Sequence, residues 1–103
     1  MSAFTLGDSK LHCKYLFDKE LIEKANSQGL KLYVQATNKA FDEQFVQFMC
    51  NEVIYDWDNV FSADNYRLEF DVDYLYMLFE QSPEIFSSVV SFCSKIDNFN
   101  EAT

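Results

Sequence analysis

The strongest constraint on the fold of this chain is a stripe of large apolar residues between positions 39 and 57. They recur at spacings of three and four, which places their side chains on one face of a helix. The members of the stripe are Phe41, Phe45, Phe48, Met49, Val53 and Trp57. Because such a stripe normally faces the interior of a domain, we expect one helix of about five turns whose apolar face forms the core. A stripe left partly exposed for a partner is the alternative.

Glycine and proline are scarce, with two and one among 103 residues. Chains with many strands need many turns, and turns use both residues, so the scarcity favours helices. Asp18 and Gly29 are suited to begin and end a helix over residues 19–28. Residues 30–36 alternate like a strand but directly precede the stripe. We interpret them as helix, while the periodicity leaves a strand open.

Two further helices are predicted toward the C-terminus. Asp71 offers an N-cap for the first. The tripeptide Ser82-Pro83-Glu84 has the cap, the first-turn proline and the acidic residue typical of a helix start. The chain is therefore predicted to be mainly α, with about four to five helices in a compact fold. One short two-stranded element, formed by residues 12–17 and 66–70, is the only β-structure that we expect.

We expect a single domain over residues 1–103, with 1–11 as an extended lead-in and 98–103 as a frayed tail. The first residues lack the pattern of a signal peptide, and no apolar run approaches the roughly 20 residues of a membrane span. Three cysteines at wide spacing do not predict a disulfide framework, so a cytoplasmic location is expected. They are Cys13, Cys50 and Cys93.

The net charge of −9 is unevenly distributed along the chain. Residues 1–41 hold four acids and six bases, whereas residues 42–80 hold ten acids and one base, Arg67. Direct binding to nucleic acid is disfavoured, because it requires a basic face. The acidic run from Asp56 to Asn65 is not an EF-hand, since Val60 and Phe61 occupy the positions of a ligand and a glycine.

No combination of residues predicts catalysis, a metal site or a cofactor. His12 and Cys13 are adjacent, so in an extended segment they point to opposite faces and cannot easily share a proton. The Cys and His residues are too widely spaced for zinc. Phosphate-binding glycine loops and nucleophile-elbow motifs are missing from the sequence. We therefore expect a protein that binds other proteins and is not an enzyme.

Residues 41–99 resemble the tail assembly chaperones of long-tailed bacteriophages. In that family an apolar helix ends in tryptophan, and an acidic turn, an extended piece and two helices follow. The matching residues are Phe45, Phe48, Met49, Val53, Trp57-Asp58-Asn59-Val60, Asp64-Asn65, Leu68 to Phe70, Leu75, Leu78, Ser82-Pro83-Glu84 and Val89. The segment from His12 to Ile22 is similar to the opening of the family. The chain departs from the pattern at Asn65, where the family turn usually carries glycine.

The resemblance implies a function in phage tail morphogenesis. Such proteins coat the long helical tape-measure protein before the tube polymerises, and they help to recruit tail-tube subunits. The partners implied are therefore the tape-measure protein and the tail-tube protein. Many members also exist in a longer form made by ribosomal frameshifting.

The aromatic content exceeds what one helical core easily hides, and exposed apolar patches usually mark interaction sites. We expect the partner-binding residues on the two C-terminal helices, namely Tyr74, Tyr76, Phe86 and Phe92. A homo-oligomer is also compatible with such a surface. Two alternatives stay open: an acidic DNA mimic that inhibits a nucleic-acid-binding or defence enzyme, and a small adaptor subunit of a cytoplasmic complex.

Overall fold

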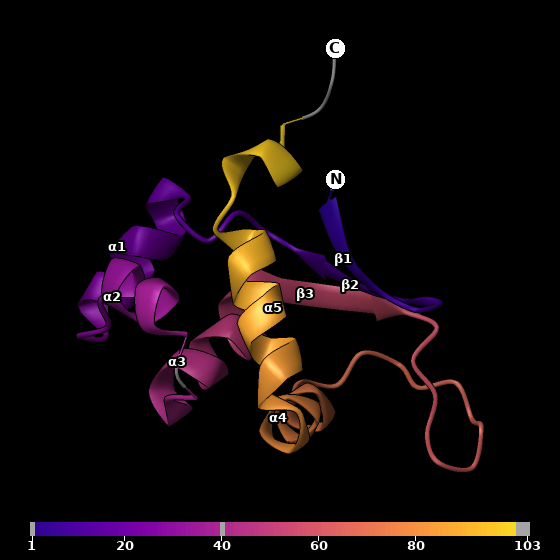
Figure 1. Ribbon diagram of the computed structural model, residues 1–103. Helices are drawn as coiled ribbons and strands as arrows, with labels where there is room; N and C mark the ends of the chain where they lie inside the picture. Colours follow the sequence, from indigo (N-terminus) through magenta and orange to yellow (C-terminus); the bar gives the residue numbers. More distant parts are fainter. Residues whose placement is uncertain (1, 40, 101–103) are drawn as a thin grey trace.

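The computed structural model describes residues 2–39 and 41–100 (Figure 1). Short helices and three strands follow one another along the chain, and they share one hydrophobic core. In chain order the elements are β1 (Ser2–Leu6), β2 (Ser9–Cys13), α1 (Lys19–Ser27), α2 (Leu32–Asn38), α3 (Glu43–Phe48), the π-helical turn η1 (Met49–Val53), β3 (Ile54–Asp58), α4 (Val72–Gln81), α5 (Pro83–Cys93) and the 3₁₀ turn η2 (Ile96–Asn98).

The three strands form an antiparallel sheet in the order β1-β2-β3. β1 and β2 are joined by a two-residue turn, Gly7-Asp8, in which Gly7 has a φ of +60°. A positive φ at the first central position is what a tight hairpin needs, and glycine adopts it without strain. The segment 1–11, expected as an extended lead-in, thus supplies most of a β-hairpin over its described residues.

The prediction of a mainly α fold is wrong, because the domain is a mixed α+β structure built on this sheet. The expected pairing of residues 12–17 with 66–70 is also absent from the described residues. Instead β2 lies between β1 and β3, and the segment 66–70 makes only an isolated bridge, between Phe61 and Arg67. Strand pairs distant in sequence leave no local signal, so the periodicity of each segment could not reveal them.

The long helix predicted over residues 39–57 is three elements. α3 begins after Asp42, whose side chain accepts a hydrogen bond from the Phe45 amide at 3.0 Å. The helix widens into η1 and then turns into β3 at Ile54. The sequence Ile-Tyr-Asp-Trp-Asp is rich in β-formers, which favours a strand over continued helix.

Trp57 nevertheless faces the core as predicted for the helix, and a β-bulge is the reason. Cys13 pairs with Ile54 and His12 with Asp56, so Tyr55 is the extra residue of β3. A bulge shifts the alternation of side chains by one residue. Ile54 and Trp57, three positions apart, therefore both point inward, which reproduces the spacing of a helix.

The helices outside residues 39–57 begin largely at the positions that their N-cap residues predict. The Asp18 side chain accepts a hydrogen bond from the amide of Glu20 at the start of α1, and Gly29, after its end, has a φ of +73°. Asp71 accepts from Asp73 and Tyr74 at the start of α4. Residues 30–36, interpreted as helix, largely form α2.

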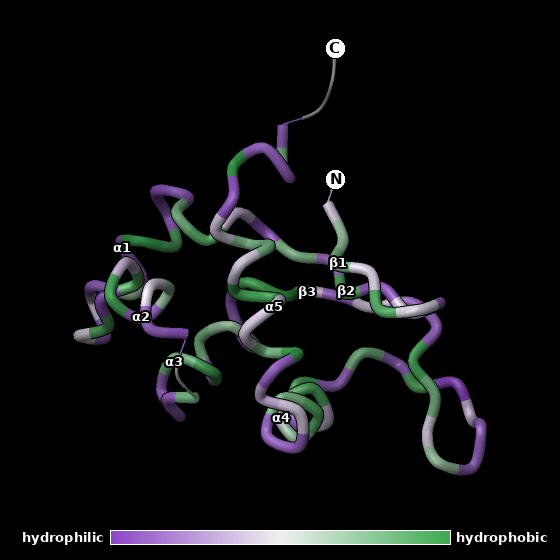
Figure 2. Tube along the Cα trace, in the orientation of Figure 1, coloured by the Kyte–Doolittle hydropathy of each residue, from purple (hydrophilic) through white to green (hydrophobic). Residues whose placement is uncertain are grey.

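The core lies between the sheet and the helices. Phe4 of β1 contacts Phe92 of α5, and Trp57 of β3 contacts Tyr74 of α4, in both cases edge to face. The hydrophobic positions of α3, α4 and α5 converge on this layer (Figure 2). Between β3 and α4 the chain forms an irregular loop, residues 59–71, which projects from the body of the domain (Figure 1).

An apolar groove as the candidate functional site

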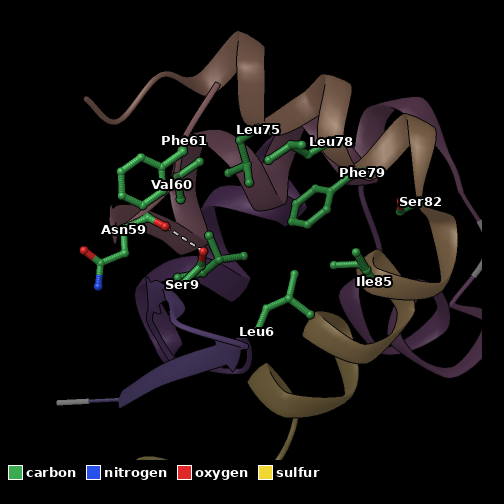
Figure 3. Close-up of a pocket in the computed structure, with 11 residues that line it drawn as sticks. Leu6, Ser9, Asn59, Val60, Phe61, Leu75, Leu78, Phe79, Ser82 and Ile85 are labelled. Carbon is green, nitrogen blue, oxygen red and sulfur yellow. Dashed lines mark hydrogen bonds between the residues drawn. The ribbon is translucent and has the colours of Figure 1, made fainter. Parts of the chain in front are cut away.

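An open apolar groove lies where the β1–β2 hairpin, the loop after β3 and the corner between α4 and α5 meet. Its volume is about 340 Å³. Side chains from all of these elements point into the same space (Figure 3). The lining residues are Leu6, Ser9, Leu11, Asn59, Val60, Phe61, Leu75, Leu78, Phe79, Ser82 and Ile85. Eight of these eleven are apolar, so the groove is suited to an apolar ligand group.

The groove has a buried floor and an exposed rim. Leu11, Leu75 and Phe79 form the floor and belong to the core of the domain. On the rim, Leu6 is 46% exposed and Phe61 is 50% exposed. Large apolar side chains that stand exposed at the edge of an apolar hollow are typical of interaction sites.

The loop that carries Phe61 is held in place by hydrogen bonds. The Ser9 hydroxyl donates to the carbonyl of Asn59 at 2.7 Å, and the Asn59 side chain donates to the carbonyl of Asp8 at 3.2 Å. The Leu68 amide donates to the carbonyl of Val60 at 2.8 Å. The Trp57 indole donates to the carbonyl of Leu68 at 2.9 Å. This wall of the groove is therefore preorganised, which lowers the entropy cost of binding.

Acidic residues flank the lining residues along the chain. Asp8 adjoins Ser9, Glu80 adjoins Phe79 and Glu84 adjoins Ile85, and all three acids are exposed, as is one base, Lys10, between Ser9 and Leu11. The nearby Arg67 is engaged by the Asn59 side chain, to which its guanidinium donates a hydrogen bond. The groove is therefore an apolar surface bordered mainly by exposed acidic residues, and its lining itself carries no charge.

The polar pair nearest to a catalytic arrangement lies away from the groove. His12 Nε2 is 2.7 Å from Asp58 Oδ2, and this hydrogen bond lowers the pKa of Asp58. Leu11 points into the groove, so the next residue, His12, points to the opposite face of the sheet. Within the described part of the chain, no group of three or more His, Cys, Asp or Glu side chains is placed to hold a metal ion.

None of the three cysteines lines the groove. All three are buried and unbridged. Burial raises the pKa of Cys50 to about 12. A hydrogen bond with Cys93 lowers the pKa of Cys13, and the same contact raises that of Cys93.

The four residues predicted to bind a partner do not form one surface. Phe86 is wholly buried and packs edge to face on Phe45 and Phe79, so it offers no surface. The other three are half-buried in separate contacts: Tyr74 packs on Trp57, Tyr76 on Phe41, and Phe92 on Phe4 and Phe99. They spread over different sides of α4 and α5 because each fills a gap in the aromatic core.

The residues predicted for the core lie as follows. Phe45, Phe48, Met49, Val53 and Trp57 are buried. Phe41 precedes α3 and is half-buried against the cluster.

Sequence reasoning missed the rim residues Leu6 and Phe61. Leu6 was placed in a featureless lead-in, although the pattern Phe-Thr-Leu-Gly-Asp-Ser-Lys-Leu contains the turn of a hairpin. Phe61 stands in a stretch rich in Asp, Asn and Ser, where no periodicity gives it a core position. A large aromatic residue in a turn-rich segment is the signal that could have indicated a surface role for Phe61.

Together these features define a small α+β domain with a preorganised apolar groove and acidic surroundings. A family model described as YdaY prophage protein matches residues 14–103, and the chain belongs to this family. It is therefore a phage-derived protein, as the resemblance to a phage family indicated. No curated protein and no solved structure matches it. Among residues 2–39 and 41–100, no helix is both long and apolar enough to cross a membrane.

Proposed function

We propose that this chain binds an apolar helical segment of another phage protein in its groove, and that it acts in this way as a tail assembly chaperone for the tape-measure protein. The observation that carries the proposal is the exposed rim of the groove. Leu6 and Phe61 are each about half exposed beside a hollow whose floor is core. Covering them with a partner removes apolar surface from water, which is the main driving force for such association.

A helix is the partner element that fits this groove best. Amphipathic helices commonly insert one apolar face into a hydrophobic groove, with anchors at spacings of three and four. Side chains of the hairpin, among them Leu6, and of the corner between α4 and α5, among them Ile85, line the groove from different elements (Figure 3). The tape-measure protein implied by the resemblance is a long helix of this kind, and it aggregates when its apolar stripe is bare.

The acidic surface supports the same function. The net charge of −9 keeps a complex with an apolar partner soluble. The groove itself contributes binding and no catalysis, so we propose a non-enzymatic function in the host cytoplasm, where tails are assembled. Recruitment of tail-tube protein would then follow from a separate surface.

The test is a calorimetric titration of the protein with helical fragments of the tape-measure protein from the same phage genome. Phe61→Ala removes a rim anchor and is expected to weaken binding by about tenfold or more, as for a buried aromatic anchor. Tyr55→Ala is the matched control, because Tyr55 is also an exposed aromatic residue, at 43%, and does not line the groove.

The outcome also separates this proposal from inhibition by DNA mimicry. Binding through the groove should change little with salt, whereas a DNA mimic should lose its partner steeply as salt screens the carboxylates. Equal affinities for the wild type, Phe61→Ala and Tyr55→Ala, together with a steep salt dependence, would count against the chaperone function.

A further inference from the structure

A second cleft lies between α2 and the C-terminal end of α5, apart from the groove. Its volume is about 270 Å³, and its lining includes Phe17, Tyr33, Lys39 and Lys95 but no carboxylate. The rings of Phe17 and Tyr33 stack in parallel with their centroids 4.3 Å apart. Tyr33 is nevertheless 63% exposed. We call this surface the basic cleft, since it combines an aromatic stack with two ammonium groups.

The tip of the loop between β3 and α4, residues 62–66, has the opposite character. Tyr66 is 72% exposed, and Asp64, two residues before it, is also exposed. The tip is ordered by hydrogen bonds from the Ser62 amide to Tyr66 and from the Asn65 amide to Ser62, at 2.8 and 2.9 Å. Asn65 has the positive φ of a tight turn. The backbone of the loop tip is therefore ordered, and it carries an exposed aromatic ring and an exposed carboxylate two residues apart.

The exposed charged residues along the chain near each surface also have opposite signs. Residues 56–73 carry six acids and one base, Arg67, and all seven side chains belong to exposed residues. Residues 30–39 carry Lys31 and Lys39 and no acid. The chain thus has an acidic region and a basic region, each centred on an exposed tyrosine.

The two surfaces lie at opposite ends of the molecule, so one copy cannot bring them together. In Figure 1, α2 stands at one side of the domain and the loop after β3 projects at the other. The domain measures 39 Å along its longest axis. An interaction between the loop tip and the basic cleft must therefore join different copies.

We propose that copies of this chain associate head to tail, with the loop tip of one copy docked in the basic cleft of the next. Tyr66 packs against the Phe17–Tyr33 stack, and Asp64 faces Lys39 and Lys95. Aromatic packing and charge complementarity both favour this pairing over contact between two identical surfaces, which would bring like charges together. This proposal is independent of the groove and of the tape-measure partner.

An interface of this kind is heterologous, since each copy uses two different patches. Such contacts generate a ring or an open row, and they do not stop at a dimer. The contact is small, so the association is expected to be weak and concentration-dependent. It should weaken several-fold when salt rises from about 0.05 M to 0.5 M, because exposed charges are then screened.

The test uses sedimentation velocity on the full chain and two double variants. Asp64→Asn with Tyr66→Ala disables the tip and leaves the cleft intact. Lys39→Gln with Lys95→Gln disables the cleft and leaves the tip intact. All four positions are exposed, so both variants should fold, and circular dichroism checks this.

The wild type is expected to associate, and each double variant alone is expected to weaken the association by about tenfold or more. An equal mixture of the two variants should form a heterodimer and nothing larger, since only one intact tip and one intact cleft remain. Phe61→Ala should associate like the wild type, which separates this surface from the groove. A wild type that stays monomeric, a tip variant that associates normally, or a mixture no larger than its components would each overturn the proposal.

Discussion

Replacement of Trp57 by phenylalanine tests how the fold positions the groove. The indole of Trp57 is 5% exposed and contacts the rings of Phe70 and Tyr74 edge to face, at centroid distances of 5.2 and 6.0 Å. Its Nε1 donates to the carbonyl of Leu68 at 2.9 Å, which ties the projecting loop to β3. Phenylalanine keeps an aromatic ring at this position but removes the donor and part of the volume.

The expected loss of stability has two parts. Leaving the Leu68 carbonyl without its partner costs about 1–3 kcal/mol. The smaller ring leaves unfilled space, for which we expect about 1 kcal/mol more. Trp57→Phe should therefore lower the free energy of unfolding by about 2–4 kcal/mol.

The assay is urea denaturation followed by far-ultraviolet circular dichroism, because the variant lacks the only tryptophan. Tyr55→Phe is the matched control: it lies two residues away on β3, is 43% exposed and should change stability by less than about 0.5 kcal/mol. If Trp57→Phe and Tyr55→Phe have the same small effect, the indole does not anchor the loop, and the reasoning about a preorganised groove wall is refuted.

Three further predictions concern the interior and the sheet face. Phe48→Ala should lower the free energy of unfolding by about 3–5 kcal/mol in urea denaturation, and a loss below about 1 kcal/mol would place this ring outside the core. Cys50, whose pKa is raised to about 12 by burial, should react with a thiol reagent near pH 8 only after denaturation, so rapid labelling at Cys50 in the native protein, located by peptide mapping, would contradict its placement. The lowered pKa of Asp58 contributes stability above its unfolded pKa of about 4, and this contribution is lost as pH falls through the folded pKa. His12→Ala should remove that part of the acid dependence, and an unchanged pH profile would show that the pair is not formed in solution.

Local signals in the sequence predicted the helices well. Asp18 and Asp71 mark helix starts because a cap depends only on residues within one turn. The same locality explains the failure at residues 39–57. Val53 and Trp57 keep a helical spacing although the chain changes from helix to strand between them, since the π-helical turn and the bulge at Tyr55 together restore the inward direction.

The pairing of β2 with β3 and the groove could not be predicted from local patterns in the sequence. β2 pairs with β3 across about forty residues, and no periodicity within either segment specifies its partner. The groove combines residues from the two halves of the chain, Leu6 with Ile85 among them. Without the sheet, the core that buries the aromatic residues of α4 and α5 is underestimated. For this reason the sequence analysis predicts that these residues bind a partner.

The claim that the groove binds an apolar helix is tested most directly by methyl NMR of the wild type during addition of a tape-measure fragment. Leu6 and Ile85 report on the groove, whereas Val34 and Ile96 are about half exposed but lie outside its lining. Binding of a helix in the groove should give intermolecular contacts and large shift changes for Leu6 and Ile85, with Val34 and Ile96 unchanged. Contacts confined to Val34 and Ile96, or a fragment that perturbs none of these methyl groups, would contradict it.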